Sequence, residues 1–314
     1  MKGVVYKSTG SWYLVKGEDG EVYRSRIRGR FRLDGIQSTN PVAVGDRVEI
    51  KIEEGKEEVR AVIVGIEERD NYIVRKSVNL SKQTHIIAAN IDIAFLLVTV
   101  AGPITTPAFI DRFLVTCEAY GIEAVLLFNK LDTYDDDQMD EVRYLAAMYR
   151  EIGYTCIGIS AITGRNIEKV KDLMKGKVCL FSGHSGVGKS TLINVIQPGL
   201  DLKTSNISSV HQQGQHTTTF AEMYDLELGA QIIDTPGIRG FGVVEMEREE
   251  IGDYFPEFFA LKQDCKFNNC LHLNEPQCAV KDALENEELF WSRYNSYVQL
   301  LEGDDTYRKD IYKE

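Results

Sequence analysis

The chain has 314 residues, and its 48 acidic side chains outnumber its 36 lysines and arginines, which gives a formal charge of −12 at pH 7. This balance excludes a protein that coats nucleic acid with general positive charge. The longest apolar run, residues 93–102, is about half of the roughly 20 residues that a membrane span requires, and no apolar stretch follows the first three residues. We therefore expect a soluble, cytoplasmic, non-secreted protein with two or three domains.

The amino-terminal segment differs from the rest in composition, because residues 1–75 carry 14 basic and 13 acidic side chains and the remainder has a net charge of −13. Its short runs alternate apolar and polar residues and are separated by Gly, Asp and Asn turns. The expected strands are 4–6, 12–15, 22–26, 47–52 and 59–66. Strands of this length and spacing predict a small β-barrel of the OB-fold kind over residues 1–72.

Arginines recur at every second position in part of this segment. They are Arg24, Arg26, Arg28, Arg30 and Arg32. In an extended strand they would share one face, where they could contact RNA phosphates, with Trp12, Tyr13 or Tyr23 as rings for base stacking. The alternative is a charged, solvated strand edge.

From about residue 90, apolar strands alternate with amphipathic helices, which predicts a parallel sheet covered on both faces. The expected strands are 93–100, 124–128, 156–159, 178–181 and 231–233. The expected helices are 107–119, 136–152 and 166–175, the first with proline at its start. Residues 75–85 carry no pattern that assigns them. We expect a nucleotide-binding α/β domain over residues 73–244.

Residues 183–190 match the phosphate-loop pattern G-x-x-x-x-G-K-[ST] between an expected strand and the helical segment 191–196. Backbone amides of such a loop surround phosphate oxygens, Lys189 reaches the β- and γ-phosphates, and the Ser190 hydroxyl ligates Mg²⁺. The alternative is a plain glycine-rich turn. The residues expected to hold the phosphates are Gly183, His184, Ser185, Gly186, Val187, Gly188, Lys189, Ser190 and Thr191.

Residues 129–132, Asn-Lys-Leu-Asp, follow an expected strand and match the N-K-x-D guanine motif. The Asp132 carboxylate can accept hydrogen bonds from guanine N1–H and the exocyclic amine, a donor pair that adenine lacks. A helix cap is the alternative role for Asp132. Ser and Ala after the next strand match the loop whose backbone contacts the guanine oxygen. The residues expected to contact guanine are Asn129, Lys130, Asp132, Ser160 and Ala161.

Residues 234–237 follow the last expected strand and match D-x-x-G, in which Asp234 holds Mg²⁺ through water and the Gly237 amide senses the γ-phosphate. Threonines 217–219 lie between the phosphate loop and this motif, and one of them can close on Mg²⁺ and the γ-phosphate. Ile238 stands where a Ras-like GTPase places the glutamine that orients water, so we expect slow hydrolysis without a partner. His216 is the candidate for positioning the water, and contact with RNA or loop capping is its alternative role.

The order of these motifs is unusual, because N-K-x-D at 129 and the Ser-Ala loop at 160 precede the phosphate loop at 183. In a Ras-like protein both follow it. Every motif still comes after a strand, so the same sheet forms if the old termini are joined and the chain is opened elsewhere. The sequence therefore predicts a circularly permuted P-loop α/β GTPase domain that binds GTP, GDP and Mg²⁺.

A cysteine and histidine cluster lies in the acidic segment 245–314, which we expect to be a zinc-binding domain. Its members are Cys265, Cys270, His272 and Cys278. Three thiols and one imidazole form a complete tetrahedral set for one structural Zn²⁺, with unligated thiols as the alternative. We expect Cys117, Cys156 and Cys179 to be core thiols. Phe290, Tyr294, Val298 and Leu301 stand at helical spacing and predict a C-terminal helix.

Together the permuted order, the barrel, Gly214-x-His216-Thr-Thr-Thr, the D-x-x-G motif and the zinc cluster resemble the RsgA (YjeQ/YloQ) family of bacterial small-subunit-dependent GTPases. The resemblance covers nearly the whole chain. It implies that the protein binds the small ribosomal subunit and its rRNA late in maturation, that hydrolysis is stimulated there, and that Thr218 is the switch threonine.

A monomer without membrane contact is expected. Two competing hypotheses are an RNA-binding module with a merely structural nucleotide site, and an ATPase. Retention of Lys189, Ser190, the threonines and Asp234 favours the enzyme over the binding module.

Overall fold

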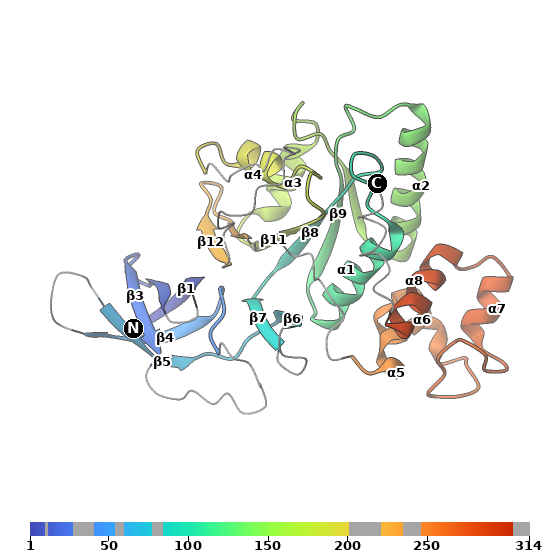
Figure 1. Cartoon of the computed structure of the whole chain (residues 1–314), viewed down its shortest axis with the longest axis horizontal. Coiled ribbons are helices and arrows are strands. Elements are labelled where there is room, and N and C mark those ends of the chain that lie inside the picture. The colour runs from blue at the N-terminus through green and yellow to red at the C-terminus, as the bar shows by residue number, and fades with distance from the viewer. Residues whose placement is uncertain are drawn as a thin grey trace, which may run out of the picture. The chain divides into compact units, whose positions relative to one another are not determined.

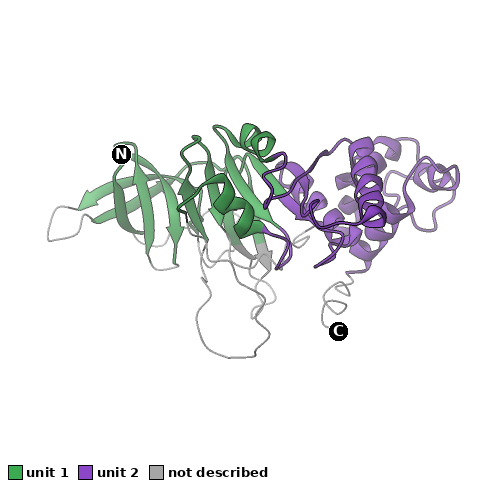
Figure 2. Ribbon diagram, turned by 90° about the horizontal axis from the view of Figure 1, so that it is seen from above, with its two compact units in different colours: residues 1–95, 167–182, 189–240 green, residues 96–166, 183–188, 241–314 purple. Residues whose placement is uncertain are grey.

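The structure is a computed structural model that describes residues 1–9, 12–27, 41–53, 60–76, 84–200, 221–234 and 246–303. Figure 2 shows its two compact units. The first unit comprises residues 1–95, 167–182 and 189–240, and the second comprises residues 96–166, 183–188 and 241–314. Within the described ranges, every helix is too short or too polar to cross a lipid bilayer.

The amino-terminal strands form a closed barrel, in blue in Figure 1. They are β1 (Lys2–Ser8), β2 (Tyr13–Gly17), β3 (Val22–Ile27), β4 (Arg47–Glu53) and β5 (Arg60–Ile66). The strand order is β1-β2-β3-β5-β4, and β4 pairs back with β1, which closes the barrel. Only the β3–β5 pairing among these is parallel. The predicted five-stranded OB-type barrel is confirmed.

Alternation along the strands builds the barrel core, because successive side chains point to opposite faces of a strand. In β3, Tyr23 and Ser25 are buried, whereas Arg24 and Arg26 are exposed. The same alternation in the neighbouring strands collects one apolar interior. Its buried members are Val5, Tyr13, Val15, Tyr23, Val42, Val48, Ile50, Ala61 and Ile63.

β6 (Tyr72–Lys76) and β7 (Thr84–Ala89) form an antiparallel hairpin that covers the ends of the unassigned stretch 75–85, of which residues 77–83 lie outside the described ranges. Asn90 Nδ2 donates to the Gly45 carbonyl at 2.9 Å, and the Ala89 amide donates to the Val44 carbonyl at 2.9 Å. Gly45 has a φ of +91°, and a Cβ there would lie 2.1 Å from the Ala89 carbonyl oxygen. Glycine is therefore required where the hairpin meets the barrel.

The first unit also contains part of the α/β sheet. Its further elements are β8 (Ile93–Val98, of which Ile93 to Phe95 belong here), α3 (Ile167–Met174), β11 (Val178–Ser182), α4 (Lys189–Ile196), β12 (Glu222–Asp225) and β13 (Gln231–Asp234). β11 and β13 are parallel, as predicted, and β12 is antiparallel to β13. β12 has no counterpart among the predicted strands.

The barrel and this sheet are joined through β12, since Lys7 of β1 pairs with Glu222. Side chains reinforce the pairing: Lys7 Nζ lies 2.8 Å from Glu222 Oε2, and Lys16 Nζ lies 2.6 Å from Asp225 Oδ2. Tyr6 donates to Asp225 Oδ1 at 2.7 Å. Within the first unit, the barrel strands thus continue into β12, β13 and β11 as one sheet.

The second unit continues with α1 (Pro107–Ala119), β9 (Glu123–Phe128), α2 (Asp136–Ile152) and β10 (Thr155–Gly158), as predicted. β9 and β10 are parallel, with Val125 opposite Thr155. Thr106 caps α1, and a capping box of Asp135 and Gln138 starts α2, which ends at Gly153 in the left-handed conformation. These caps fix where the loops at the sheet edge begin.

Four further helices surround the cysteine cluster in the second unit. They are α5 (Arg248–Ile251), α6 (Pro256–Lys262), α7 (Ala279–Glu285) and α8 (Trp291–Glu302). The predicted C-terminal helix is confirmed. Leu301 of the predicted apolar set is buried together with Arg293, Tyr297 and Leu300, and Tyr294 and Val298 are partly buried against the same core. α5 to α7 have no counterpart among the predicted helices.

Candidate functional site

Asn129 joins three loops of the second unit directly after β9. It is buried, its Nδ2 donates to the Val187 carbonyl at 2.8 Å, and its Oδ1 accepts from the Ala161 amide at 3.2 Å. A Cβ on Gly188 would lie 2.5 Å from Asn129 Nδ2. The structure therefore brings together the N-K-x-D motif, the Ser-Ala loop and the phosphate loop, although they are far apart in the sequence.

Asp132 lies beside Ser160, whose hydroxyl donates to Asp132 Oδ1 at 2.5 Å. Ser160 Oγ in turn accepts from the Thr163 amide at 3.1 Å, which fixes the hydroxyl. A carboxylate has about four acceptor positions, so both oxygens of Asp132 keep the capacity to accept from a base. This geometry fits a reader of paired N–H donors better than it fits a helix cap, a role that Asp135 fills instead.

Lys130 adopts a left-handed φ of +68°, and its Nζ donates to the Gly102 carbonyl. Partial burial lowers the pKa of Lys130, and the charge of Asp132 opposes this shift. Lys130 also ties the N-K-x-D motif to the loop that follows β8.

Tyr134 makes a second link between the N-K-x-D loop and the loop after β8, and it belongs to no sequence motif. Its hydroxyl donates to the Asn129 carbonyl at 2.8 Å and accepts from the Val100 amide at 3.2 Å. Burial raises the pKa of this phenol, so it remains a neutral donor. The only sequence signal is an aromatic residue two positions after the motif.

The phosphate loop depends on glycine at three positions. Gly183, Gly186 and Gly188 have φ values of +141°, +85° and +99°. A Cβ on Gly183 would lie 2.8 Å from the Leu97 carbonyl oxygen. The ring of His184 packs on Phe109 of α1, with centroids 3.9 Å apart. Glycine therefore permits both the backbone bend and the close approach of neighbouring chains.

Lys189 and Ser190 begin α4 in the first unit, followed by Thr191. In that unit Asp234 ends β13, and its burial raises the pKa of the carboxyl while the charge of Lys189 lowers it. Lys189 is therefore close enough to Asp234 for their charges to interact. His216, Thr217 to Thr219, Gly237 and Ile238 lie outside the described residues.

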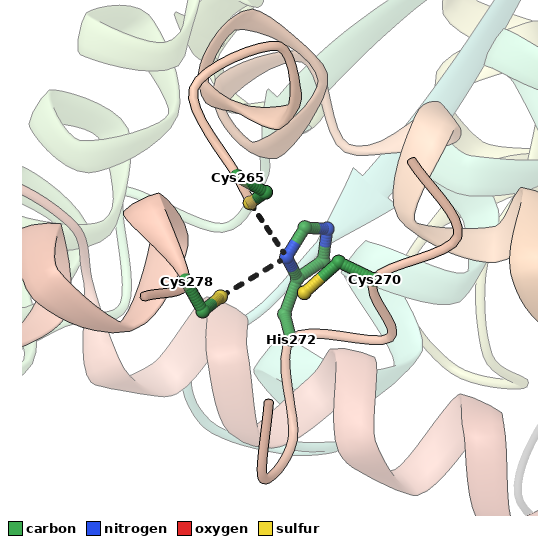
Figure 3. Close-up of side chains that lie close together, drawn as sticks. All are labelled: Cys265, Cys270, His272 and Cys278. Atoms are coloured by element: carbon green, nitrogen blue, oxygen red, sulfur yellow. Dashed lines mark hydrogen bonds between the residues drawn. The ribbon is translucent and has the colours of Figure 1, made fainter. Parts of the chain in front are cut away.

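The metal cluster is assembled as predicted (Figure 3). One ligand atom each from Cys265, Cys270, His272 and Cys278 lies within 4.8 Å of the others, and all four residues are buried. His272 Nδ1 lies 3.7 Å from Cys265 Sγ and 3.3 Å from Cys278 Sγ. Burial raises the pKa of Cys270 to about 12 in the absence of a cation. Three thiols and one imidazole at this spacing fit a tetrahedral zinc ion, whose charge would favour the thiolates.

Three side chains that were not predicted to belong to the metal cluster hold the backbone of the His272 turn. The Glu275 carboxylate accepts from the amides of Leu271, Leu273 and Asn274 at 2.9, 2.9 and 3.0 Å. These bonds lower the pKa of Glu275 against the opposing effect of burial. Tyr294 and Tyr297 donate to the carbonyls of His272 and Leu271, each at 2.7 Å.

The arginine stripe is present where the structure describes it. Arg24 and Arg26 are exposed, with the Arg24 guanidinium 4.5 Å from the Trp12 ring and Arg26 Nη2 3.2 Å from Glu53 Oε2. The prediction that Tyr13 or Tyr23 could stack on RNA bases is wrong, since these rings are 2% and 5% exposed in the barrel core. Arg28, Arg30 and Arg32 lie outside the described residues.

The remaining thiols are buried, as predicted for core cysteines. Burial raises the pKa of Cys156 and of Cys179 to about 12. It raises the pKa of Cys117 further still. These thiols stay protonated and have no part in the metal cluster.

Comparisons with known proteins identify the family of the chain. The profile of the family described as RsgA GTPase matches residues 66–244, and that of the RsgA N-terminal domain matches residues 2–59. A relative named small ribosomal subunit biogenesis GTPase RsgA, from Christiangramia forsetii, is 67% identical over 100% of both chains. One of the same name from Flavobacterium psychrophilum is 61% identical over 100% of this chain and 97% of its own.

Two solved structures also resemble the chain over nearly its full length. YjeQ from Thermotoga maritima has a TM-score of 0.78 at 36% identity, covering 96% of this chain and 97% of its own. YloQ, described as a circularly permuted GTPase, has a TM-score of 0.72 at 31% identity, covering 100% and 96%. The permuted order of strands and motifs is thus shared with solved relatives.

Proposed function

Because the chain belongs to the RsgA GTPase family, we propose that it hydrolyses GTP to GDP and phosphate, binds the small ribosomal subunit through rRNA and assists its late maturation. The observation that carries the nucleotide part is the junction at Asn129, which connects the guanine motif to the phosphate loop at 2.8 Å and to the Ser-Ala loop at 3.2 Å. The names of the relatives support the proposed role in maturation of the small ribosomal subunit. We further propose a cytoplasmic monomer with functional domains at 1–72, 73–244 and 245–314.

In this proposal Asp132 accepts from guanine N1–H and N2, held in place by Ser160. Lys130 lies along the base, and the Ala161 backbone contacts the guanine oxygen. Residues 183–188 surround the phosphates with backbone amides, and Thr191 adds a contact at the start of α4. This set would bind GTP and GDP but reject ATP, because adenine leaves the Asp132 carboxylate without its donors.

The γ-phosphate end is assigned to Lys189, Ser190, Asp234 and two residues outside the described ranges, Thr218 and Gly237. Ser190 and Thr218 would ligate Mg²⁺, and Asp234 would hold it through water. When bound, Mg²⁺ neutralises charge on the β- and γ-phosphates. Lys189 stabilises the same charge on the transferring group, and the nearby Asp234 carboxyl balances it when no nucleotide is present.

Water activation is the step for which the chain lacks the usual glutamine, since Ile238 follows the D-x-x-G motif. An isoleucine side chain cannot hydrogen-bond water. We propose that His216 positions the water once the subunit orders the switch threonines. Hydrolysis is then slow in isolation and faster on the subunit.

The guanine assignment is tested with Asp132→Asn in a competition of GTP against xanthosine triphosphate. The amide presents one acceptor and one donor, so we expect weaker GTP binding and a preference for xanthine. Asp135→Asn is the matched control, because this neighbouring residue caps α2 and faces no base in the proposal. Unchanged GTP preference in the Asp132→Asn variant would rule out Asp132 as the reader of the base. ATP competing as well as GTP in the wild type would instead support the ATPase hypothesis.

The ribosomal part is tested by GTP turnover with and without purified small subunits. We expect stimulation in the wild type and its loss in His216→Ala, with GTP affinity and subunit binding retained. Wild-type turnover in that variant would show that His216 has no catalytic role. If small subunits do not change the rate of turnover and nucleotide does not change the affinity for RNA, the binding-module hypothesis is supported instead.

A further inference from the structure

Arg293 of α8 is a fully buried cation at the point where four helices of the second unit meet. Its Nη1 lies 2.7 Å from Asp111 Oδ1 of α1, and its Nε lies 2.7 Å from Glu257 Oε1 of α6. Tyr149 of α2 donates to the same Asp111 oxygen at 2.8 Å. The guanidinium also packs on the Phe255 ring, 4.5 Å from its centroid. α1 and α2 of the nucleotide-binding part are thereby tied to α6 and α8 around the metal cluster.

The opposite side of α1 faces the phosphate loop. Phe109 is 4% exposed, and its ring centroid lies 3.9 Å from that of His184, the second residue of the loop. Residues two apart in a helix point to opposite sides, so Phe109 and Asp111 contact different neighbours. α1 therefore lies between the phosphate loop and α8, and every contact in this chain of residues belongs to the second unit.

We propose that α1 acts as a two-sided strut, in which Phe109 positions the phosphate loop and the Asp111–Arg293 pair couples that position to the zinc-binding helices. The inference rests on the nucleotide site of the proposed function. Phe109, Asp111 and Arg293 are positioning residues in it, since each acts through another residue. We call Arg293 and its partners Asp111 and Glu257 the anchor. The proposed coupling is reciprocal: nucleotide binding stabilises α8, and an intact anchor strengthens nucleotide binding by the same factor.

The chemistry of the anchor explains why it is suited to this role. Removing one partner of a buried ion pair leaves an uncompensated charge, so the four helices cannot separate or slide without a large penalty. Phe109 is two residues from Asp111 in the same helix. A shift of α1 that moves the Asp111–Arg293 pair therefore also moves the apolar contact between Phe109 and His184.

The test measures amide hydrogen exchange in residues 291–302 of the full chain, without nucleotide and with saturating GDP, alongside titration of fluorescent GDP. In the wild type we expect GDP to slow exchange in α8. In Phe109→Leu we expect GDP affinity to fall about 5- to 150-fold, the range of typical coupling factors. At saturating GDP this variant should show no protection of α8, although its fold and metal content are retained.

A second variant changes the contact of α1 with α8. Asp111→Leu, Glu257→Gln and Arg293→Met together remove the anchor without leaving a buried unpaired charge. They should lower GDP affinity by a comparable factor and abolish the nucleotide effect on α8. Arg143→Met is the control, because its ion pair with Asp140 on α2 is exposed, and it should behave as the wild type.

Two results would overturn the coupling alone: wild-type protein that binds GDP with unchanged exchange in α8, or both variants binding GDP with wild-type affinity. Failure of the wild type to bind GDP at all would overturn the proposed function together with the coupling. Because each exchange difference is taken within one variant, a general loss of stability does not imitate the expected result.

Discussion

The Asp46 carboxylate connects the backbone of the segment before β4 to the Arg69 side chain after β5. It is fully buried and accepts from the Ala43 amide at 2.8 Å and from Arg69 Nε and Nη2 at 2.6 and 2.7 Å. Arg69 also donates to the Pro41 carbonyl at 2.9 Å. Both Asp46 oxygens and the Nε and Nη2 atoms of Arg69 have partners, which makes the burial of two charges tolerable.

We predict that Asp46→Ala destabilises the protein by about 3–5 kcal/mol, because it leaves the Arg69 guanidinium buried without its counter-charge. Urea unfolding followed by circular dichroism measures the change. Arg47→Ala is the matched control, since its ion pair with Asp70 is exposed and such pairs contribute about 0–1 kcal/mol. Equal losses of unfolding free energy in the two variants would show that burial of the Asp46–Arg69 pair does not matter for stability.

Glu275 supports the metal cluster without being a ligand. We predict that Glu275→Ala accelerates zinc loss to a chelator about 10- to 100-fold, because three amides of the His272 turn lose their acceptor. A colorimetric chelator measures the rate. Glu285→Ala, an exposed residue at the end of α7, serves as control. Equal release rates in both variants would show that the turn keeps its shape without the carboxylate.

Residues that follow a motif can be predicted from the sequence, whereas residues that depend on distant partners cannot. The four metal ligands stand within 14 residues, and their spacing alone indicates the cluster. Arg293 pairs with Asp111, which is 182 positions away, so no local pattern predicts its burial. Tyr134 likewise acts through the backbone of Asn129, and backbone contacts leave no signature in residue type.

At the scale of elements, α5, α6 and α7 are too short to persist alone, with 4, 7 and 7 residues. They pack around a core that includes Cys265, Cys270 and Cys278 themselves, beside Phe255, Phe258 and Tyr297. A metal ion that holds the three cysteines would therefore also hold the helices together.

Zinc removal should unfold this region and spare the barrel. We predict one zinc ion per chain by metal analysis, and increased hydrogen exchange across residues 246–303 after chelation, with unchanged exchange in β1 to β5. The barrel has its own core and no cysteine, so it serves as an internal control. A Cys270→Ser variant of undiminished stability would contradict a structural metal worth several kcal/mol.

Short elements also mark the limit of prediction from periodicity. β12 has only four residues, which all pair with β13, and Glu222 also pairs with Lys7 of β1. Its strand character therefore comes from pairing and not from its own pattern. For α8, apolar spacing indicated a helix with Tyr294, Val298 and Leu301 on one side. Arg293 is buried as well, which apolar spacing does not predict, because ion pairing makes its burial possible.

At the scale of the whole molecule, the permutation gives the chain a particular connectivity. β13 ends at Asp234 and α5 begins at Arg248, so in the sequence the D-x-x-G motif directly precedes the helices around the cysteine cluster. In an unpermuted GTPase the chain returns to the sheet at this point. This connection along the chain is distinct from the α1 contacts on which the proposed coupling rests.

The pairing of β1 with β12 has a consequence for solubility. Without β1, the open side of β12 would present unpaired backbone groups, a template onto which a second copy could add its own strand. We predict that Lys7→Glu with Lys16→Glu, which places like charges opposite Glu222 and Asp225, promotes concentration-dependent association measured by light scattering. Lys171→Glu on α3 with Lys175→Glu directly after its end changes the net charge equally, away from that junction, and should leave the protein dispersed. Besides any contact with RNA, the barrel then shields the GTPase sheet from self-assembly.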